Sequence, residues 1–246
     1  HLLSRNFAMM STEVTRQMWA DLNSRQSSLP ADPSNVSYSP NMNNPVQTVS
    51  WYEAVLFANL LSIQGGLTRC YYKDASLTVP VDASNYTTGD FYCDFDASGY
   101  RLPTEGERER AGRADTTTPF WIVETNYATG NCTNATPGLF PSLESVAWIL
   151  NNSSGFYTSS PVGMKPANPW GLHDMIGNVW EWCWDWYGIY PSGSQTDYSG
   201  PVFGLDRVLR GGAWTNQAEH QRSANRNEGS TPPEFRYRDI GFRLVR

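Results

Sequence analysis

The stretch Asn178-Val-Trp-Glu-Trp-Cys-Trp-Asp-Trp-Tyr187 decides the fold, because tryptophan occupies every second position from 180 to 186. Alternate residues of a β-strand face opposite sides, so the pattern predicts a strand with four indoles on one side. Burying that surface stabilises the fold by several kcal/mol, at about 25 cal/mol per Å². We therefore expect a central core strand rather than an aromatic platform for sugars. Glu181 and Asp185 share the other side, where a crowded carboxylate is expected to bind a cation or an arginine.

Composition limits the classes of partner. The chain has 246 residues, with 24 acidic and 18 basic side chains and a net charge of −6, which argues against general binding to nucleic acid or anionic lipid. With 39% apolar and 17% charged residues it is expected to be globular, as one large domain or two small ones. The longest apolar run, residues 54–63, is half the length of a membrane helix, so no transmembrane segment is predicted. His1 opens the chain without a basic or apolar leader, so the sequence itself does not indicate a localisation.

Two capping boxes mark the starts of helices. Ser50 is followed three residues later by Glu53, and Thr104 by Glu107, so each pair can satisfy backbone amides of a first helical turn. The expected helices span residues 15–22, 50–64 and 104–113. Frequent Gly, Pro, Asn and Ser elsewhere predict short strands and long loops, and hence an α+β fold with a high loop content.

The four cysteines, Cys70, Cys93, Cys132 and Cys183, are widely spaced. Without a Cys-x-x-Cys pair, zinc ribbons and thioredoxin-like sites are excluded. Two disulfides and four unpaired thiols both remain open. Cys70 and Cys93 are the better candidate pair, because each lies beside two aromatic residues in what are expected to be neighbouring strands.

Residues 214–239 form a polar, turn-rich segment between two expected strands, 207–209 and 240–245. A loop held at both ends by strands is typical of binding sites, although an irregular surface loop without a ligand is the alternative. Phe235 and Tyr237 are expected to project together as aromatic anchors. The candidate ligand-binding residues are Trp214, Thr215, Asn216, Glu219, His220, Ser223, Asn225, Asn227, Ser230, Phe235, Tyr237 and Asp239.

Five blocks of the chain resemble successive signatures of the formylglycine-generating-enzyme (sulfatase-modifying factor) family. They are residues 44–51, 99–105, 168–182, 207–214 and 241–246. The resemblance implies one domain over 1–246 with a C-type-lectin-like fold, two main helices, small twisted antiparallel sheets and adjacent terminal strands. It also implies a structural calcium ion near Asn178 and Glu181, unless Glu181 pairs with an arginine or with backbone amides. Arg108 and Arg110 replace the family's usual aromatic residues, so this helix face is expected to be more hydrated.

The same resemblance bears on catalysis. The family's enzyme oxidises a cysteine of its substrate with two cysteines of its own that bind copper, and those positions carry Asn216 and Gln221 here. An amide cannot replace a thiolate as a redox centre or soft copper ligand, so we expect neither an enzyme nor copper. A related branch, the iron-dependent sulfoxide synthases, needs a histidine triad, but His1, His173 and His220 are scattered along the chain.

The chain also resembles variable proteins of diversity-generating retroelements, including a treponemal one, some of which share this fold. In those proteins the segment between the blocks that correspond to 207–214 and 241–246 is diversified at adenine-containing codons. The resemblance therefore implies that 207–246 is a variable ligand-binding region. Most of the candidate residues are reachable from asparagine codons, whereas Gln217, Glu219 and Gln221 are not.

The leading hypothesis is thus a non-catalytic, receptor-like protein that binds an unknown protein or other macromolecule. By resemblance we expect a monomer at the cell surface or secreted, with lipid anchoring through a preceding N-terminal segment as one route. A modifying enzyme of the formylglycine-generating type with altered catalytic residues is the alternative. A structural accessory domain without a ligand is the third option.

Overall fold

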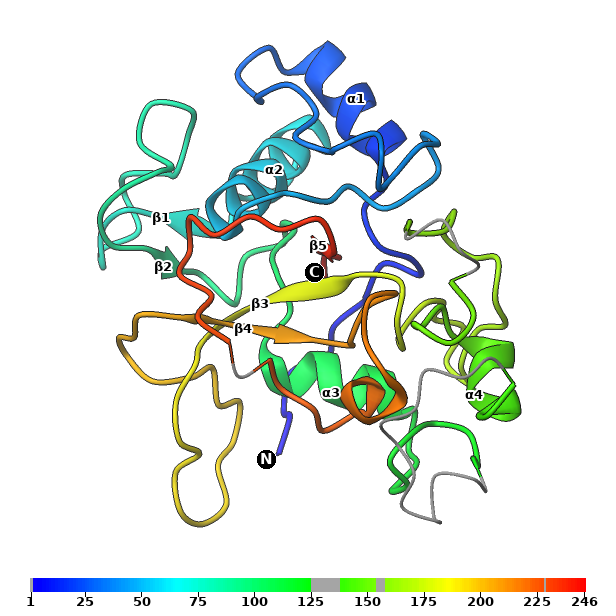
Figure 1. Cartoon of the computed structure of the whole chain (residues 1–246). Coiled ribbons are helices and arrows are strands. Elements are labelled where there is room, and N and C mark those ends of the chain that lie inside the picture. The colour runs from blue at the N-terminus through cyan, green and yellow to red at the C-terminus, as the bar shows by residue number, and fades with distance from the viewer. Residues whose placement is uncertain (1, 125–137, 154–157, 228) are drawn as a thin grey trace.

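A three-stranded sheet lies at the centre of the computed structural model, which describes residues 2–124, 138–153, 158–227 and 229–246. Its strand order is β4-β3-β5, with β3 (Trp180–Trp186) between β4 (Arg207–Arg210) and β5 (Ile240–Gly241) (Figure 1). The central position predicted for the tryptophan-rich strand is confirmed. β4 pairs with β3 in antiparallel fashion, but β5 pairs in parallel, so the expectation of purely antiparallel sheets is wrong at this strand. The long connection over 211–239 makes the parallel return possible.

The helices follow the capping boxes. Ser50 precedes α2 (Trp51–Gln64) and Thr104 precedes α3 (Glu105–Arg113), and each side chain accepts the predicted amide at 3.2 Å. The remaining helices are α1 (Arg16–Arg25), the short α4 (Pro141–Val146) and the 3-10 turn η2 (Ala218–Gln221). In the view of Figure 1, α1 and α2 lie above the central sheet and α3 lies below it.

Of the two cysteines predicted to lie in neighbouring strands, Cys93 does so, whereas Cys70 directly precedes the first strand, and the two thiols are not bonded to each other. β1 (Tyr71–Tyr72) and β2 (Tyr92–Cys93) form an antiparallel pair in which Tyr71 faces Cys93. Cys70, Cys93 and Cys183 are free thiols, and burial raises the pKa of Cys70 to about 11. Thiols held protonated in this way are poor nucleophiles. Cys132 lies outside the described residues.

Trp180 and Trp182 of β3 lie in the main core and Trp184 packs against it, as predicted, whereas Trp186 is half-buried outside that cluster. Trp182 is fully buried and donates its indole N–H to the Val49 carbonyl at 2.9 Å. The guanidinium carbon of Arg207 lies 3.8 Å from the ring centroid of Trp51 and 3.4 Å from that of Trp186. Burial lowers the pKa of Arg207 to about 9, and the aromatic faces provide part of the attraction that water would otherwise supply. The strand therefore has a structural role along most of its length.

The two ends of the chain lie side by side, as the family resemblance implies. Ala8 N–H donates to the Arg246 carbonyl at 2.8 Å, and Arg246 N–H donates back to the Ala8 carbonyl at 2.9 Å. Among the residues that the structure describes, no helix is both long and apolar enough to cross a membrane.

Candidate functional site

The 214–239 segment wraps around the start of β3. β4 ends at Arg210, which pairs with Glu181, and the chain returns in β5 at Ile240, which pairs with Trp180. Both ends of the connection are thus fixed at the same end of the central strand. The segment contains η2, and in the view of Figure 1 it passes from the lower side of the sheet to β5.

Two amides hold the first turn of the segment together. The side-chain oxygen Oδ1 of Asn216 accepts the Ala213 N–H at 3.0 Å, and the Gln221 side-chain amide donates to the backbone carbonyls of Ala213 at 2.9 Å and Asn216 at 3.2 Å. Asn216 and Gln221 are the positions at which the resemblance places catalytic cysteines. Here they serve as clamps on the backbone, so the expectation that Asn216 offers an adaptable ligand contact does not fit the structure.

We call the residues whose side chains hold the segment in place its frame. Besides Asn216 and Gln221, three members of the predicted set belong to the frame. Trp214 is fully buried and stacks on Tyr38 with ring centroids 6.2 Å apart. Thr215 donates its hydroxyl to Asp239, which is buried, and burial raises the pKa of Asp239. The sequence placed all three at a ligand surface, but their side chains support that surface from within.

The remaining predicted residues, except Ser223, line pockets next to Trp180, which is buried at 6% exposure. Two pockets of about 260 Å³ and 220 Å³ share Trp180, Asn227 and Gly229. The first is also lined by Glu219, His220, Arg222, Asn225 and Arg226, and the second by Ser230, Thr231, Phe235, Tyr237, Asp239 and Ile240. Trp180 was missed as a site residue because the alternation assigned it to the core with the other indoles. Its place at the first position of the strand is the only sequence signal that could have singled it out.

Phe235 and Tyr237, predicted to project together, stack on each other, but Phe235 is half-buried and packs against the main core. The rings of Phe235 and Tyr237 stack with centroids 6.1 Å apart and planes 12° apart. Tyr237 is 47% exposed. Its carbonyl accepts the Thr48 N–H at 3.0 Å, and the Trp51 N–H donates to the Pro233 carbonyl at 3.0 Å, so the backbone here is fixed against the start of α2.

Ion pairs with the start of α3 hold the middle of the segment in place. The Nε atom of Arg226 lies 2.7 Å from a Glu105 carboxylate oxygen at the start of α3, and Arg210 lies 3.6 Å from the same oxygen. The Tyr190 hydroxyl donates to this oxygen at 2.9 Å. Ser223 is held by its backbone, because its N–H donates to the Pro119 carbonyl at 2.7 Å. Much of the segment is therefore positioned by groups other than its exposed side chains.

Glu181 pairs with two arginines, which was the predicted alternative to binding a calcium ion. Arg108 donates to its carboxylate at 2.7 and 3.1 Å, and Arg243 at 2.8 and 2.9 Å. Burial alone would raise the pKa of Glu181, but the two guanidinium groups lower it. Arg108 is itself buried, so the expectation of a hydrated helix face is wrong at this residue. Its guanidinium is desolvated because it matches a buried carboxylate.

The predicted calcium ligands therefore do not fit a calcium ion. Both oxygens of Glu181 are occupied by guanidinium donors, and the side-chain oxygen Oδ1 of Asn178 accepts the Ser160 N–H at 3.0 Å. Calcium needs six to eight oxygen ligands. Among the described ranges, no group of three or more His, Cys, Asp or Glu residues is suitable for a metal ion.

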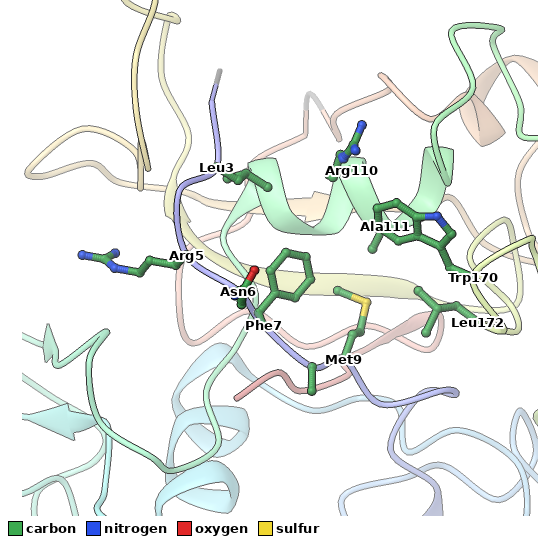
Figure 2. Close-up of a pocket in the computed structure, with 10 residues that line it drawn as sticks. Leu3, Arg5, Asn6, Phe7, Met9, Arg110, Ala111, Trp170 and Leu172 are labelled. Atoms are coloured by element: carbon green, nitrogen blue, oxygen red, sulfur yellow. The ribbon is translucent and has the colours of Figure 1, made fainter.

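A larger pocket, of about 450 Å³, lies away from the 214–239 segment (Figure 2). The N-terminal segment contributes Phe7 and Met9, α3 contributes Arg110 and Ala111, and Trp170 closes one side. The Arg110 guanidinium carbon lies 5.2 Å from the Trp170 ring centroid. None of the predicted site residues lines this pocket.

The fold and the frame around β3 define a domain of the formylglycine-generating type. The chain belongs to the sulfatase-modifying factor enzyme 1-like domain family, whose sequence profile matches residues 2–246. It is similar to the solved structure of Treponema denticola variable protein 1, with 32% identity and a TM-score of 0.79, over 99% of this chain and 84% of that chain.

Other relatives are longer proteins. Formylglycine-generating enzyme of Mus musculus is 29% identical over 208 residues, which cover 81% of this chain and 52% of that protein. Serine/threonine-protein kinase pkn1 of Chlamydia caviae is 35% identical over 164 residues, which cover 62% of this chain and 23% of that protein. The chain thus spans about half or less of these two proteins.

Proposed function

We propose that the chain is a non-catalytic, receptor-like binding protein whose 214–239 segment presents a diversifiable surface, as a variable protein of a diversity-generating retroelement. The observation that carries the proposal is that some side chains of the segment hold it in place, whereas others are exposed to solvent. The side chains of Trp214, Thr215, Asn216 and Asp239 contact other parts of the protein and hold the segment in place, whereas residues such as His220 and Tyr237 are exposed around Trp180. Because the exposed side chains do not hold the segment in place, they can be changed without loss of the fold. The likeness to the treponemal variable protein supports the same conclusion.

The shape of the surface favours a macromolecular ligand. Its two pockets, of about 260 and 220 Å³, are each smaller than the roughly 300–1,000 Å³ typical of small-molecule sites. They are open, adjoining depressions with a stacked aromatic pair, charged side chains and amides. Tyrosine and asparagine are residues that binding loops use to contact proteins.

The chemistry of the clamp residues supports a binding role over an enzymatic one. A modifying enzyme of the formylglycine-generating type with altered catalytic residues is the alternative. It would have to oxidise a substrate cysteine with amides at positions 216 and 221, and both amides are engaged by backbone groups. Incubation with copper, oxygen and a cysteine-containing sulfatase peptide distinguishes the two functions. We expect no aldehyde product, and turnover would establish the alternative.

The binding function itself is tested on an array of purified secreted and cell-surface proteins, from bacteria and their hosts. We expect the labelled chain to bind particular proteins on the array. The variants His220→Ala and Tyr237→Ala should weaken that binding, whereas the control Tyr92→Ala, at an exposed tyrosine of β2, should not. Binding that none of these changes affects would exclude the 214–239 segment as the site.

By the same resemblance we propose that the surface is displayed outside the cell, either on the envelope or in secreted form. Protease treatment of intact producing cells tests this. Loss of the chain from the cells, or its recovery from the medium, supports the proposal, whereas protection until lysis would contradict it.

A further inference from the structure

The loop between β3 and β4 exposes a group of large apolar side chains. Ile189 is 95% exposed, Val202 96%, Phe203 85% and Leu205 84%. Single exposed apolar residues are common, but several such residues gathered in one loop point to an interaction site. We call these four residues the apolar loop patch.

The backbone of this loop is held in place, so the exposure is built into the fold. A Cβ on Gly188 would lie 2.6 Å from Pro201, which shows that the two arms of the loop lie side by side. Gly204 packs against the Trp186 side chain, so the residues on either side of it, Phe203 and Leu205, are directed away from the core.

The patch continues into the 214–239 segment. Arg226 donates to the Gly188 carbonyl at 2.7 Å, next to Ile189. At the other arm, the Thr231 N–H donates to the Asp206 carboxylate at 2.6 Å, next to Leu205. A partner that covers residues 226–231 would therefore adjoin the patch.

The charge of the loop favours a protein over a lipid surface. Residues 187–206 contain Asp197 and Asp206 but no lysine or arginine. Both carboxylates accept backbone hydrogen bonds, from Ser4 and Thr231. Binding to anionic membranes relies on basic residues next to the apolar ones, and this loop has none.

We propose that the apolar loop patch is a fixed docking surface for the same protein that the 214–239 segment recognises, an inference that rests on the proposed function. Protein interfaces commonly combine an apolar core with a polar rim. The patch provides the apolar contact area common to all partners, and the polar residues around Trp180 provide selectivity. The expected partner carries an apolar, weakly charged patch opposite Phe203 and Leu205.

The test applies the double variant Phe203→Ser/Leu205→Ser to the protein array described above. Its matched control is Ile63→Ser/Val79→Ser, at apolar residues that are 41% and 48% exposed on other parts of the chain. Thermal melting should show both variants folded, because all four side chains face solvent. We expect the loop variant to bind each array partner at least about tenfold more weakly, as loss of a central apolar contact does, and the control to bind as the parent does.

The outcomes separate the two proposals. If the loop variant binds normally while Tyr237→Ala does not, the docking role is wrong and the proposed function stands. If the loop variant loses binding but Tyr237→Ala and His220→Ala do not, the 214–239 site is wrong and so is the shared partner. Two further results overturn the inference in favour of other occupants. One is Phe203-dependent binding to phosphatidylcholine/phosphatidylglycerol vesicles, and the other is a dimer in sedimentation velocity that the loop variant abolishes. An array without any binder overturns both proposals.

Discussion

Among single residues, Trp182 shows most directly how the sequence determines the core. Its ring is fully buried in the main apolar cluster, and its indole N–H is satisfied by the Val49 carbonyl. Trp182→Ala should lower the free energy of unfolding by about 3 to 5 kcal/mol, because it removes a large buried ring and leaves a cavity. Denaturant titration measures the change, with the 42% exposed Trp170 replaced by alanine as the control. A loss below about 1 kcal/mol would mean that β3 is peripheral.

The ion pairs of Glu181 with Arg108 and Arg243 predict that removing one of these arginines destabilises the fold. Arg108→Leu should destabilise the protein by about 3 kcal/mol, because Glu181 stays buried with only Arg243 as its charged partner. Arg110→Leu, two positions along the same helix, is the control. Arg110 forms an exposed ion pair with Asp115, and such a pair contributes at most about 1 kcal/mol.

The same ion pairs predict how the protein responds to calcium. Since Arg108 and Arg243 already occupy the Glu181 carboxylate, neither calcium nor a chelator should change the melting temperature. A rise with calcium and a fall with the chelator would restore the metal site that the family resemblance implies.

Asp185 predicts a dependence on pH. Burial raises its pKa to about 8, against about 4 in an unfolded chain. Between these values the folded state retains a proton that the unfolded state releases, so stability falls as the pH rises from about 4 to 8. Asp185→Asn cannot ionise and keeps an oxygen for the Glu105 N–H, so its stability should fall less over this range. Glu13, Asp174 and Asp239, whose pKa values are also raised, contribute equally to both proteins. Parallel profiles from denaturation at pH 5 and pH 8 would contradict this assignment.

Elements with strong local signals were predicted well from the sequence. The boxes at Ser50 and Thr104 mark the starts of α2 and α3, because capping is a local interaction that the sequence records directly. α4 was missed, since it is short and Phe140 provides no side-chain cap. The parallel pairing of β5 was missed as well, because it depends on the path of the 211–239 connection rather than on a local pattern.

Glycine in a strand allows a close approach of neighbouring backbone. A Cβ on Gly241 in β5 would lie 2.6 Å from the Val46 carbonyl oxygen. Gly241→Ala should therefore cost about 1 to 3 kcal/mol, the usual range for overpacking. Gly65→Ala, where the nearest atom would be 3.5 Å away, serves as the control and should be close to neutral. Equal melting temperatures for the two variants would show that the sheet can shift to accept a side chain.

At the scale of the whole molecule, the sequence located the candidate site but could not divide it into surface and frame. Phe235 and Tyr237 stack on each other as their spacing predicted, but only Tyr237 is exposed, because Phe235 packs against the main core. Trp214 and Asp239 are buried because they contact Tyr38 and Thr215, which are distant in sequence, and such contacts leave no local pattern. The same is true of Arg108, whose partner Glu181 lies 73 positions away.

The division between surface and frame is the central claim, and one comparison of two variant sets tests it most directly. The surface set is His220→Tyr, Asn227→Ser and Tyr237→Asn, and the frame set is Thr215→Ala, Asn216→Ala and Asp239→Ala. Each set is combined in one chain, and both the melting temperature and the pattern of partners on the protein array are measured. The surface set should melt within about 2 °C of the parent, which corresponds to less than about 1 kcal/mol, and should bind a different set of partners. The frame set should melt markedly lower. A surface set that unfolds, or that binds the same partners as the parent, would contradict a diversifiable binding surface.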